Sequence, residues 1–328
     1  MKRRKYVAPP SERPAPPLPQ SRSCVVRCDS PDFRRFSDLL RGEIEVIGVE
    51  TAESPVALHI GHPQHWKPIE GKINIGFGWW PASSPDDIRA FYGIDDLIVP
   101  SAWNSQTPMP KPHQAVHIVR AGIDDRIFAP SNRTRERRPL RFLAIAERAD
   151  DRAPGIDLAA RAFIAADLNA TLDVYGYAPV AALFGDRRVQ TKRFIGSERE
   201  LAALFDRYDA LIYSARGDGA GLMALKAMAR GLPTLHSGQT GMAEFADLGL
   251  LIGSRKVVLA DSSYWHEPLV DLLAQRIAAF RADDDKARAD SVAVRERHSI
   301  RALAARVMEV VHVAQQSRNV PERSRLPG

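Results

Sequence analysis

The strongest chemical signal in the sequence is a glycine-rich turn, SARGDGAG, that follows the apolar run DALIYS at residues 209–214. Gly217, Gly219 and Gly221 would let the backbone approach a ligand closely. A helix predicted to begin there would offer unpaired N–H groups and the positive end of its dipole. Such a turn suits a phosphate, but a plain strand-to-helix turn has the same composition. It is not a P-loop, because no Gly-Lys-Ser/Thr follows.

Three histidines and two tryptophans in the first half of the chain could also do chemistry. His59, His62 and His65 lie at spacings of three in LHIGHPQHW. However, His59 and His62 would face opposite sides of an extended strand, so we expect no metal site. Trp79 and Trp80 follow another predicted strand and could stack on the ring of an acceptor molecule. A polar loop and a buried core tryptophan are the structural alternatives.

The elements that must position these residues alternate along the chain. Short β-branched runs are followed by segments of helical periodicity, which predicts an α/β fold with parallel sheets. Strands are expected at 24–28, 44–49, 56–60, 73–77, 97–100, 115–119, 140–147, 171–176, 188–196, 209–214, 232–237 and 249–253. Helices are expected at 31–41, 85–92, 102–107, 156–166, 198–206, 221–230, 241–247, 267–281 and 294–315. In such folds ligands bind beyond the carboxyl ends of the strands.

Composition divides the chain into four parts. Residues 1–22 are basic and rich in proline, which predicts a disordered tail, and residues 316–328 form a second polar tail. The charged, proline-containing segment 128–140 is typical of a linker between domains. We therefore expect an N-terminal domain at 23–130 and a C-terminal domain at 131–315.

The composition also excludes several classes of protein. With 45% hydrophobic and 26% charged residues in 328, the chain is neither disordered nor collagen-like. Its two cysteines, Cys24 and Cys28, are too far apart on a strand for a disulfide, and we expect buried thiols. No apolar run reaches the ~18 residues of a transmembrane helix. Prolines follow the basic start, so no secretory signal is expected. We predict a cytoplasmic protein, in the host cytoplasm if it is phage-encoded.

The charge balance favours an anionic partner. The net charge is +6 and the pI is about 9.4, which is typical of proteins that bind nucleic acid, phosphate compounds or acidic membranes. No block of the chain holds most of the excess. Two local clusters stand out, Lys2–Lys5 in the first tail and an arginine group in the expected linker region: Arg133, Arg135, Arg137, Arg138 and Arg141.

With its flanks, the glycine-rich turn resembles a known site. The segment 214–245, SARGDGAGLMALKAMARGLPTLHSGQTGMAEF, resembles the nucleotide-sugar site of retaining glycosyltransferases of family 4, S-x-x-E-G-F-G-L-x-x-L-E-A-M-A-x-G-x-P followed by a glycine and a glutamate. Further segments resemble the family in the right order over about residues 95–315, among them LRFLAIAERADDRAPGIDLAARAF and FIGSERELAALFDRYDALIYS. The residues before 95 match only loosely. The resemblance implies the GT-B fold, two Rossmann-like α/β domains with an interdomain cleft.

The resemblance implies roles for charged residues, with departures from the family pattern. The family's paired glutamates fall on Asp218, which keeps the charge near the donor sugar, and on Lys226, which inverts it at the nucleotide ribose. An ammonium group cannot accept hydrogen bonds from ribose hydroxyls. The family's arginine at the donor diphosphate falls on Arg148. Its lysine falls on Pro154, with Arg152 nearby as a replacement.

The remaining site residues follow in the same way. Glu244 would contact the donor sugar, and the alternative is an ordinary acidic residue at a helix N-terminus. His59 or His62 would also face the donor sugar. The expected catalytic residues are Asp218, Arg148, His59 and His62. The expected donor-binding residues are Arg148, Arg152, Gly217, Asp218, Gly219, Ala220, Gly221, Lys226 and Glu244. Trp79 and Trp80 are the expected acceptor-binding residues.

The function that this resemblance implies is transfer of a sugar from a nucleotide-sugar donor, a UDP-sugar or similar, to an acceptor hydroxyl with retention and without a metal. The acceptor is open between a saccharide, lipid or small molecule and a hydroxymethylated base in phage DNA, which would have to be flipped out of the duplex. A further alternative is a catalytically degenerate GT-B protein that binds a ligand or partner.

Overall fold

The computed structural model describes residues 23–29, 33–47, 49–50, 54–78, 91–106, 115–131, 139–146, 155–176, 185–192, 196–259 and 264–318. The chain forms two compact units. The first is Met1–Gly122 together with Ile300–Gly328, and the second is Ile123–Ser299. Each unit contains a six-stranded sheet. In the described part of the chain, no helix is both long enough and apolar enough to cross a bilayer.

The sheet of the first unit has the order β2-β1-β3-β4-β5-β6, and all of its strand pairs are parallel. Its strands are β1 (Ser23–Arg27), β2 (Val49–Glu50), β3 (Val56–Ile60), β4 (Ile73–Phe77), β5 (Asp96–Val99) and β6 (Ala115–Ile118). Strands β3 and β4 are buried along their whole length, as expected for parallel strands covered on both faces. The order changes direction between β1 and β3, which makes this a topological switch point.

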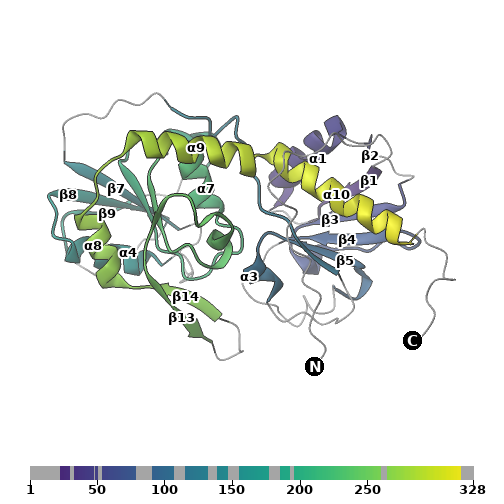
Figure 1. The fold of residues 1–328 in the computed structure, drawn as a ribbon, viewed down its shortest axis with the longest axis horizontal. Coiled ribbons are helices and arrows are strands. Elements are labelled where there is room, and N and C mark those ends of the chain that lie inside the picture. The colour runs from purple at the N-terminus through teal and green to yellow at the C-terminus, as the bar shows by residue number, and fades with distance from the viewer. Residues whose placement is uncertain are drawn as a thin grey trace. The chain divides into compact units, whose positions relative to one another are not determined.

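Two helices from opposite ends of the chain cover one face of this sheet. Helix α1 (Arg34–Ile47) and helix α10 (Ile300–Arg318) pack against each other and share one apolar core with β1, β3 and β4 (Figure 1). The other face carries a smaller cluster around Trp66 and Phe91, whose ring centroids are 5.7 Å apart. The short elements of this unit are η2 (Pro63–His65), η3 (Phe91–Gly93) and α3 (Ala102–Ser105).

Helix α1 differs from the prediction for its segment. The sequence predicted a helix at 31–41 and a strand at 44–49, but α1 continues to Ile47 and β2 is only Val49–Glu50. The physical reason is the spacing of Ser37, Leu40 and Ile44. All three are buried, so the helical period reaches the first residue of the expected strand.

The sheet of the second unit has the order β12-β11-β10-β7-β8-β9, again with parallel pairs. Its strands are β7 (Leu140–Ile145), β8 (Ala170–Tyr175), β9 (Val189–Lys192), β10 (Ala210–Tyr213), β11 (Thr234–His236) and β12 (Leu250–Leu251). Counted along the chain from β7, the order read from β9 to β12 is 3-2-1-4-5-6, the Rossmann order. Its switch point lies between β7 and β10.

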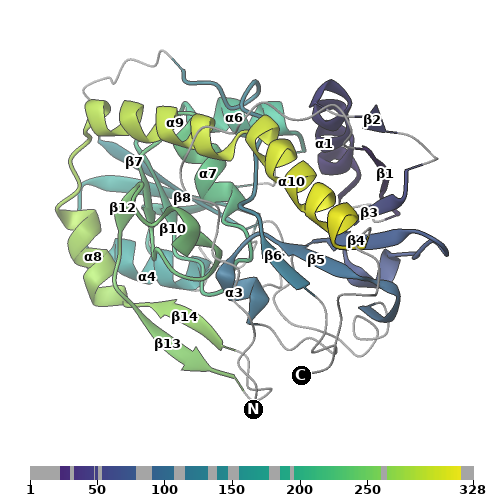
Figure 2. The same cartoon turned by 45° about the vertical axis from the view of Figure 1, so that its right-hand side comes forward.

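Helices cover both faces of this second sheet. One apolar core packs α6 (Glu198–Phe205), α7 (Leu222–Ala229), η4 (Thr240–Phe245) and part of α9 (Asp284–His298). The other packs α4 (Ile156–Ala165) and α8 (Val270–Ala278). An antiparallel hairpin, β13 (Ser254–Val258) and β14 (Tyr264–Pro268), extends away from the sheet (Figure 2). The sequence predicted a helix from 267 and no hairpin.

The structure divides the chain differently from the expected boundaries at 130 and 315. The second unit begins at Ile123, because Ile123 and Phe128 are buried in its core. The expected last helix, 294–315, is two helices. α9 ends at His298, Ser299 is extended with ψ 156°, and α10 begins at Ile300. The apolar side chains of α10 pack in the first unit, so this segment belongs there.

Candidate functional site

Two segments of the second unit meet at the carboxyl edge of its sheet, at the switch point. Ser214, directly after β10, donates its hydroxyl hydrogen to the carbonyl oxygen of Gly155, the N-cap of α4, at 2.6 Å. Gly155 has φ +66°, and a Cβ there would overlap the Ser214 carbonyl group. The start of α4 is therefore packed directly against the start of the glycine-rich turn.

Asp218 organises that turn. Its Oδ1 accepts hydrogen bonds from the N–H groups of Ala220 and Gly221, both at 2.9 Å, and its Oδ2 accepts one from the Tyr213 hydroxyl. Two of the amides that the sequence suggested for phosphate are thus donated to a carboxylate of the turn itself. The structure gives Asp218 a positioning role, while its contact with a donor sugar stays a prediction.

The start of α7 supplies other N–H groups at this edge. Gly221 is the N-cap, with φ 65°, and the Leu225 N–H donates to its carbonyl oxygen at 3.0 Å. The N–H groups of Leu222, Met223 and Ala224 come before this first helical hydrogen bond and so have no acceptor within the helix. Together with the positive end of the α7 dipole, they can bind an anion.

The short helix η4 holds the turn from one side. The Gly241 N–H donates to the Asp218 carbonyl oxygen at 2.6 Å, and a Cβ at Gly241 would lie 2.5 Å from that oxygen. Thr240 has φ +57°, which is strained for a β-branched residue, and its Oγ1 accepts from the Asp218 N–H at 3.4 Å. The ring of Phe245 lies against Gly221, where a Cβ would be only 2.5 Å away. The backbone strain thus occurs where η4 contacts the turn.

Glu244 lies on the same short helix. Its side chain is half-buried, and η4 is the element that contacts the glycine-rich turn. The structure therefore places it on an element of this site, while its role toward a donor sugar stays a prediction.

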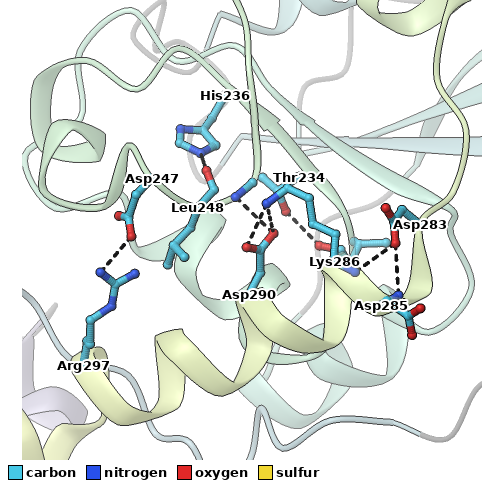
Figure 3. Close-up of polar contacts among 11 residues, drawn as sticks. Thr234, His236, Asp247, Leu248, Asp283, Asp285, Lys286, Asp290 and Arg297 are labelled. Carbon is cyan, nitrogen blue, oxygen red and sulfur yellow. Dashed lines mark hydrogen bonds and ion pairs between the residues drawn. The ribbon is translucent and has the colours of Figure 1, made fainter.

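Helix α9 fixes the chain that follows η4. The Gly249 N–H donates to Asp290 Oδ2 at 3.1 Å, and the Lys286 ammonium binds the same carboxylate at 2.9 Å (Figure 3). Asp247 pairs with Arg297 at 2.9 Å. Because one end of this segment contacts the turn and the other is bonded to α9, η4 is restrained at both ends.

His236 lies buried at the end of β11 and is neutral. Its Nε2 donates to the carbonyl oxygen of Leu248 at 2.8 Å (Figure 3). This direction follows because its Nδ1 accepts from the Gly238 N–H at 3.2 Å. Burial lowers the pKa of His236 to about 4.

Arg216 is the residue of the turn that sequence reasoning missed. Its guanidinium donates to both carboxylate oxygens of Asp157 on α4, at 2.8 and 2.7 Å, and to Glu267 on β14 at 3.2 Å. It lies 5.7 Å from the ring centroid of Trp265, and only 8% of its side chain is exposed. Burial opposes ionisation of Asp157, but hydrogen bonds and charge from Arg216 outweigh it and lower the pKa of Asp157. Arg216 therefore joins the turn, α4 and the hairpin.

Lys226 has partners in its own unit. Its ammonium lies 2.9 Å from Glu198 Oε1, on the first turn of α6, and 5.7 Å from the ring centroid of Phe128. The Lys226 side chain therefore extends toward α6 and forms an ion pair there.

The two candidate histidines of the first unit have different surroundings. His59, on β3, is 2% exposed, and its Nε2 lies 2.9 Å from Asn74 Oδ1. Burial lowers the pKa of His59. His62 is half-buried beyond the end of β3, with its ring edge-to-face with Phe33 at 5.1 Å. The burial of His59 makes His62 the more accessible candidate.

Other expected site residues lie outside the described residues, namely Arg148, Arg152, Trp79 and Trp80. Within the described ranges, no three His, Cys, Asp or Glu side chains form a group that could hold a metal ion. Independence from metals stays a prediction.

Comparison with known families decides the class of the protein. A family model described as family 4 glycosyltransferase in conflict systems matches residues 100–309, more than half of the chain. The chain belongs to this family. It is a glycosyltransferase, and the family and enzyme class predicted from the sequence are confirmed. No curated protein matches its sequence.

Solved structures confirm the GT-B fold of this glycosyltransferase. AviGT4, a glycosyltransferase involved in avilamycin A biosynthesis, has a TM-score of 0.64 at 12% identity, covering 90% of this chain and 98% of its own. Sucrose-phosphate synthase from Thermosynechococcus elongatus has a TM-score of 0.60 at 16% identity, covering 86% and 78%. The pneumococcal O-GlcNAc transferase GtfA, in complex with UDP and GlcNAc, has a TM-score of 0.55 at 16% identity, covering 79% and 57%.

Proposed function

We propose that this glycosyltransferase moves a sugar from a nucleotide-sugar donor, a UDP-sugar or similar, to an acceptor hydroxyl, and that its second unit holds the donor. The observation that carries the proposal is the start of α7. Its N–H groups follow a glycine-rich turn at the switch point of a Rossmann sheet, where nucleotides bind in this class of fold. The presence of UDP in the similar structure of GtfA supports the choice of donor.

The proposed mechanism uses positive potential at the leaving group. The bond between the sugar C1 and the diphosphate oxygen breaks through an oxocarbenium-like state while the acceptor oxygen bonds to C1 from the same side. The acceptor proton passes to the leaving phosphate. The N–H groups of Leu222, Met223 and Ala224, together with Arg148 and Arg152, would stabilise the charge that develops on that phosphate. No side-chain nucleophile and no metal is required.

The proposed acceptor is a saccharide, lipid or small molecule, and the second candidate is a hydroxymethylated base in phage DNA. The second candidate is kept because the net charge is +6 and the family's description refers to conflict systems. An enzyme acting on such DNA would work in the host cytoplasm and would flip the base out of the duplex.

Nucleotide release in a panel of sugar nucleotides and acceptors tests the proposed reaction. Arg148→Ala removes a cation at the diphosphate, and Asp218→Ala frees the turn that leads into α7, so we expect each to abolish transfer. Arg276→Ala, on the exposed face of α8, is the matched control and should keep full activity. Full activity in the first two variants, or no turnover with any donor, would contradict the proposal.

A comparison of hydroxymethylated with ordinary duplex DNA distinguishes the DNA acceptor from the saccharide, lipid or small-molecule acceptor. With DNA as the acceptor, transfer should occur on hydroxymethylated but not on ordinary duplex and should fall steeply with salt, because phosphate contacts release counterions. Transfer to a glycan or lipid, with neither duplex accepting sugar, would exclude the DNA candidate.

A further inference from the structure

The ion pair between Glu198 and Lys226 lies between two helices that begin at the carboxyl edge of the second sheet. Glu198 is the first residue of α6, whose N-cap Ser197 accepts from the Glu200 N–H at 3.2 Å. Lys226 lies one helical turn after Leu222, the first residue of α7. Because helical side chains lean toward the N-terminus, Lys226 extends toward that edge and meets Glu198 there at 2.9 Å.

The two members of the pair differ in exposure and in contacts. The Lys226 side chain is 14% exposed and that of Glu198 is 28% exposed. Lys226 also lies against the Phe128 ring, so it is held from two sides. Among the described residues, the Glu198 carboxylate contacts Lys226 through Oε1 and makes no other hydrogen bond or ion pair. The carboxylate therefore has hydrogen-bonding capacity left at the more accessible end of the pair.

The pair is partly buried, but the Glu198 carboxylate keeps contact with solvent, so it can also meet a ligand. A carboxylate accepts hydrogen bonds at about four lone-pair positions, whereas an ammonium group only donates. The vicinal hydroxyls of a ribose are donors that match such a carboxylate, and Rossmann folds use an Asp or Glu side chain for this purpose.

We propose that Glu198, positioned by Lys226, accepts hydrogen bonds from the ribose hydroxyls of the donor nucleotide. Glu198 is then the residue that selects a ribonucleotide, and Lys226 is a positioning residue that acts through it. This proposal rests on the proposed function, since it requires a nucleotide at the start of α7.

Binding of nucleotides with altered ribose to the full chain tests the proposal. UDP, GDP and ADP are titrated by calorimetry, and the tightest is compared with its 2′-deoxy and 3′-deoxy forms. We expect the full chain to bind the ribonucleotide at least about tenfold more tightly than a deoxy form, because one charge-assisted hydrogen bond is worth about 1.5–3 kcal/mol. Glu198→Ala should weaken the ribonucleotide at least about tenfold and weaken each deoxy form less, because a deoxy form has only one hydroxyl left to lose its acceptor. The preference for ribose would then disappear.

Variants of the lysine and a distant glutamate complete the experiment. Lys226→Met should reduce the ribose preference only in part, and Lys226→Arg, which keeps an ion pair, should restore it. Glu296→Gln, on the exposed face of α9, should bind like the unaltered chain. If Glu198→Ala lowers the melting temperature but keeps the ribose preference, the pair is structural and the proposal is wrong. If no nucleotide binds at all, the proposed function fails with it.

Discussion

The imidazole of His236 is enclosed at the end of β11, and its protonation is linked to stability. Its pKa is lowered by burial from 6.5 to about 4. Between these two pH values the unfolded chain binds a proton at this residue and the folded chain does not, so the free energy of unfolding falls as the pH falls through this window. Above pH 6.5 both states are neutral and the residue adds no pH dependence. Within this window, His236 should lower the free energy of unfolding by about 1.4 kcal/mol for each unit by which the pH falls.

Replacement of this histidine by glutamine isolates that contribution. The amide of His236→Gln can donate to the Leu248 carbonyl and accept from the Gly238 N–H without titrating. Denaturant unfolding followed by circular dichroism from pH 4.5 to 8 should give a shallower pH dependence for the variant below pH 6.5 and parallel curves above it. Parallel curves over the whole range would show that His236 is not protonated on unfolding.

Single residues also show how far the sequence could define the site. The glycine-rich turn was recognisable because its glycines, Ser214 and Asp218 are adjacent in sequence. The contacts of Arg216 were not, since its carboxylate partners are 59 and 51 positions away. For the same reason the sequence showed only that Lys226 replaces a glutamate of the family pattern. The structure pairs this lysine with Glu198 on another helix.

Among the elements, the β13–β14 hairpin depends on Arg216 for its attachment to the glycine-rich turn. Besides the ion pairs, the His266 N–H donates to the Arg216 carbonyl oxygen at 2.8 Å. Arg216→Met would leave Asp157 and Glu267 without their partner, which we expect to lower the free energy of unfolding by about 1–3 kcal/mol. Hydrogen exchange of the backbone amides in 254–258 and 264–267 should become faster.

Arg255→Met is the matched control for that variant. Arg255 pairs with the same Glu267 at 3.1 Å, but 66% of its side chain is exposed. Its loss should cost less than about 1 kcal/mol and leave amide exchange in the hairpin nearly unchanged. Equal effects of the two variants would show that Arg216 does not hold the hairpin.

Elements were predictable where their period was unambiguous. The apolar, mostly buried runs of β3, β4, β7 and β8 indicated strands correctly. The hairpin was missed because its strands, SRKVV and YWHEP, carry charges and a proline and do not resemble core strands. The end of α1 was missed because the run IEVIGV alternates as a strand does, while the buried residues Ser37, Leu40 and Ile44 follow the helical period.

For the whole molecule, the sequence predicted two α/β domains but not the return of the chain to the first unit. An apolar face on α10 shows that the helix is covered, but not by which core. In the structure Leu303, Val307 and Val311 are fully buried in the core of the first unit. The same helix could have closed the second unit without any change in its period, so only tertiary contacts decide its place.

This division predicts which fragments fold. In the second unit, the Ile123 N–H donates to the His298 carbonyl oxygen at 2.8 Å, and Ile123 pairs with Ser299, so the two ends of 123–299 are adjacent. A fragment 123–299 keeps both of its cores and should unfold cooperatively and bind the nucleotide that the full chain binds. A fragment 1–122 lacks α10, exposes the core of the first unit and should not fold.

Adding a peptide of residues 300–318 in trans provides the decisive comparison. If α10 covers that core, the peptide should restore helical circular dichroism and a thermal transition to fragment 1–122. A peptide in which Leu303, Val307 and Val311 are changed to Asp should not, because three charges would enter an apolar core. A fragment 1–122 that folds alone would show that the first core does not need α10. A fragment 123–299 that needs the peptide would assign α10 to the second unit, and either result would contradict the division seen here.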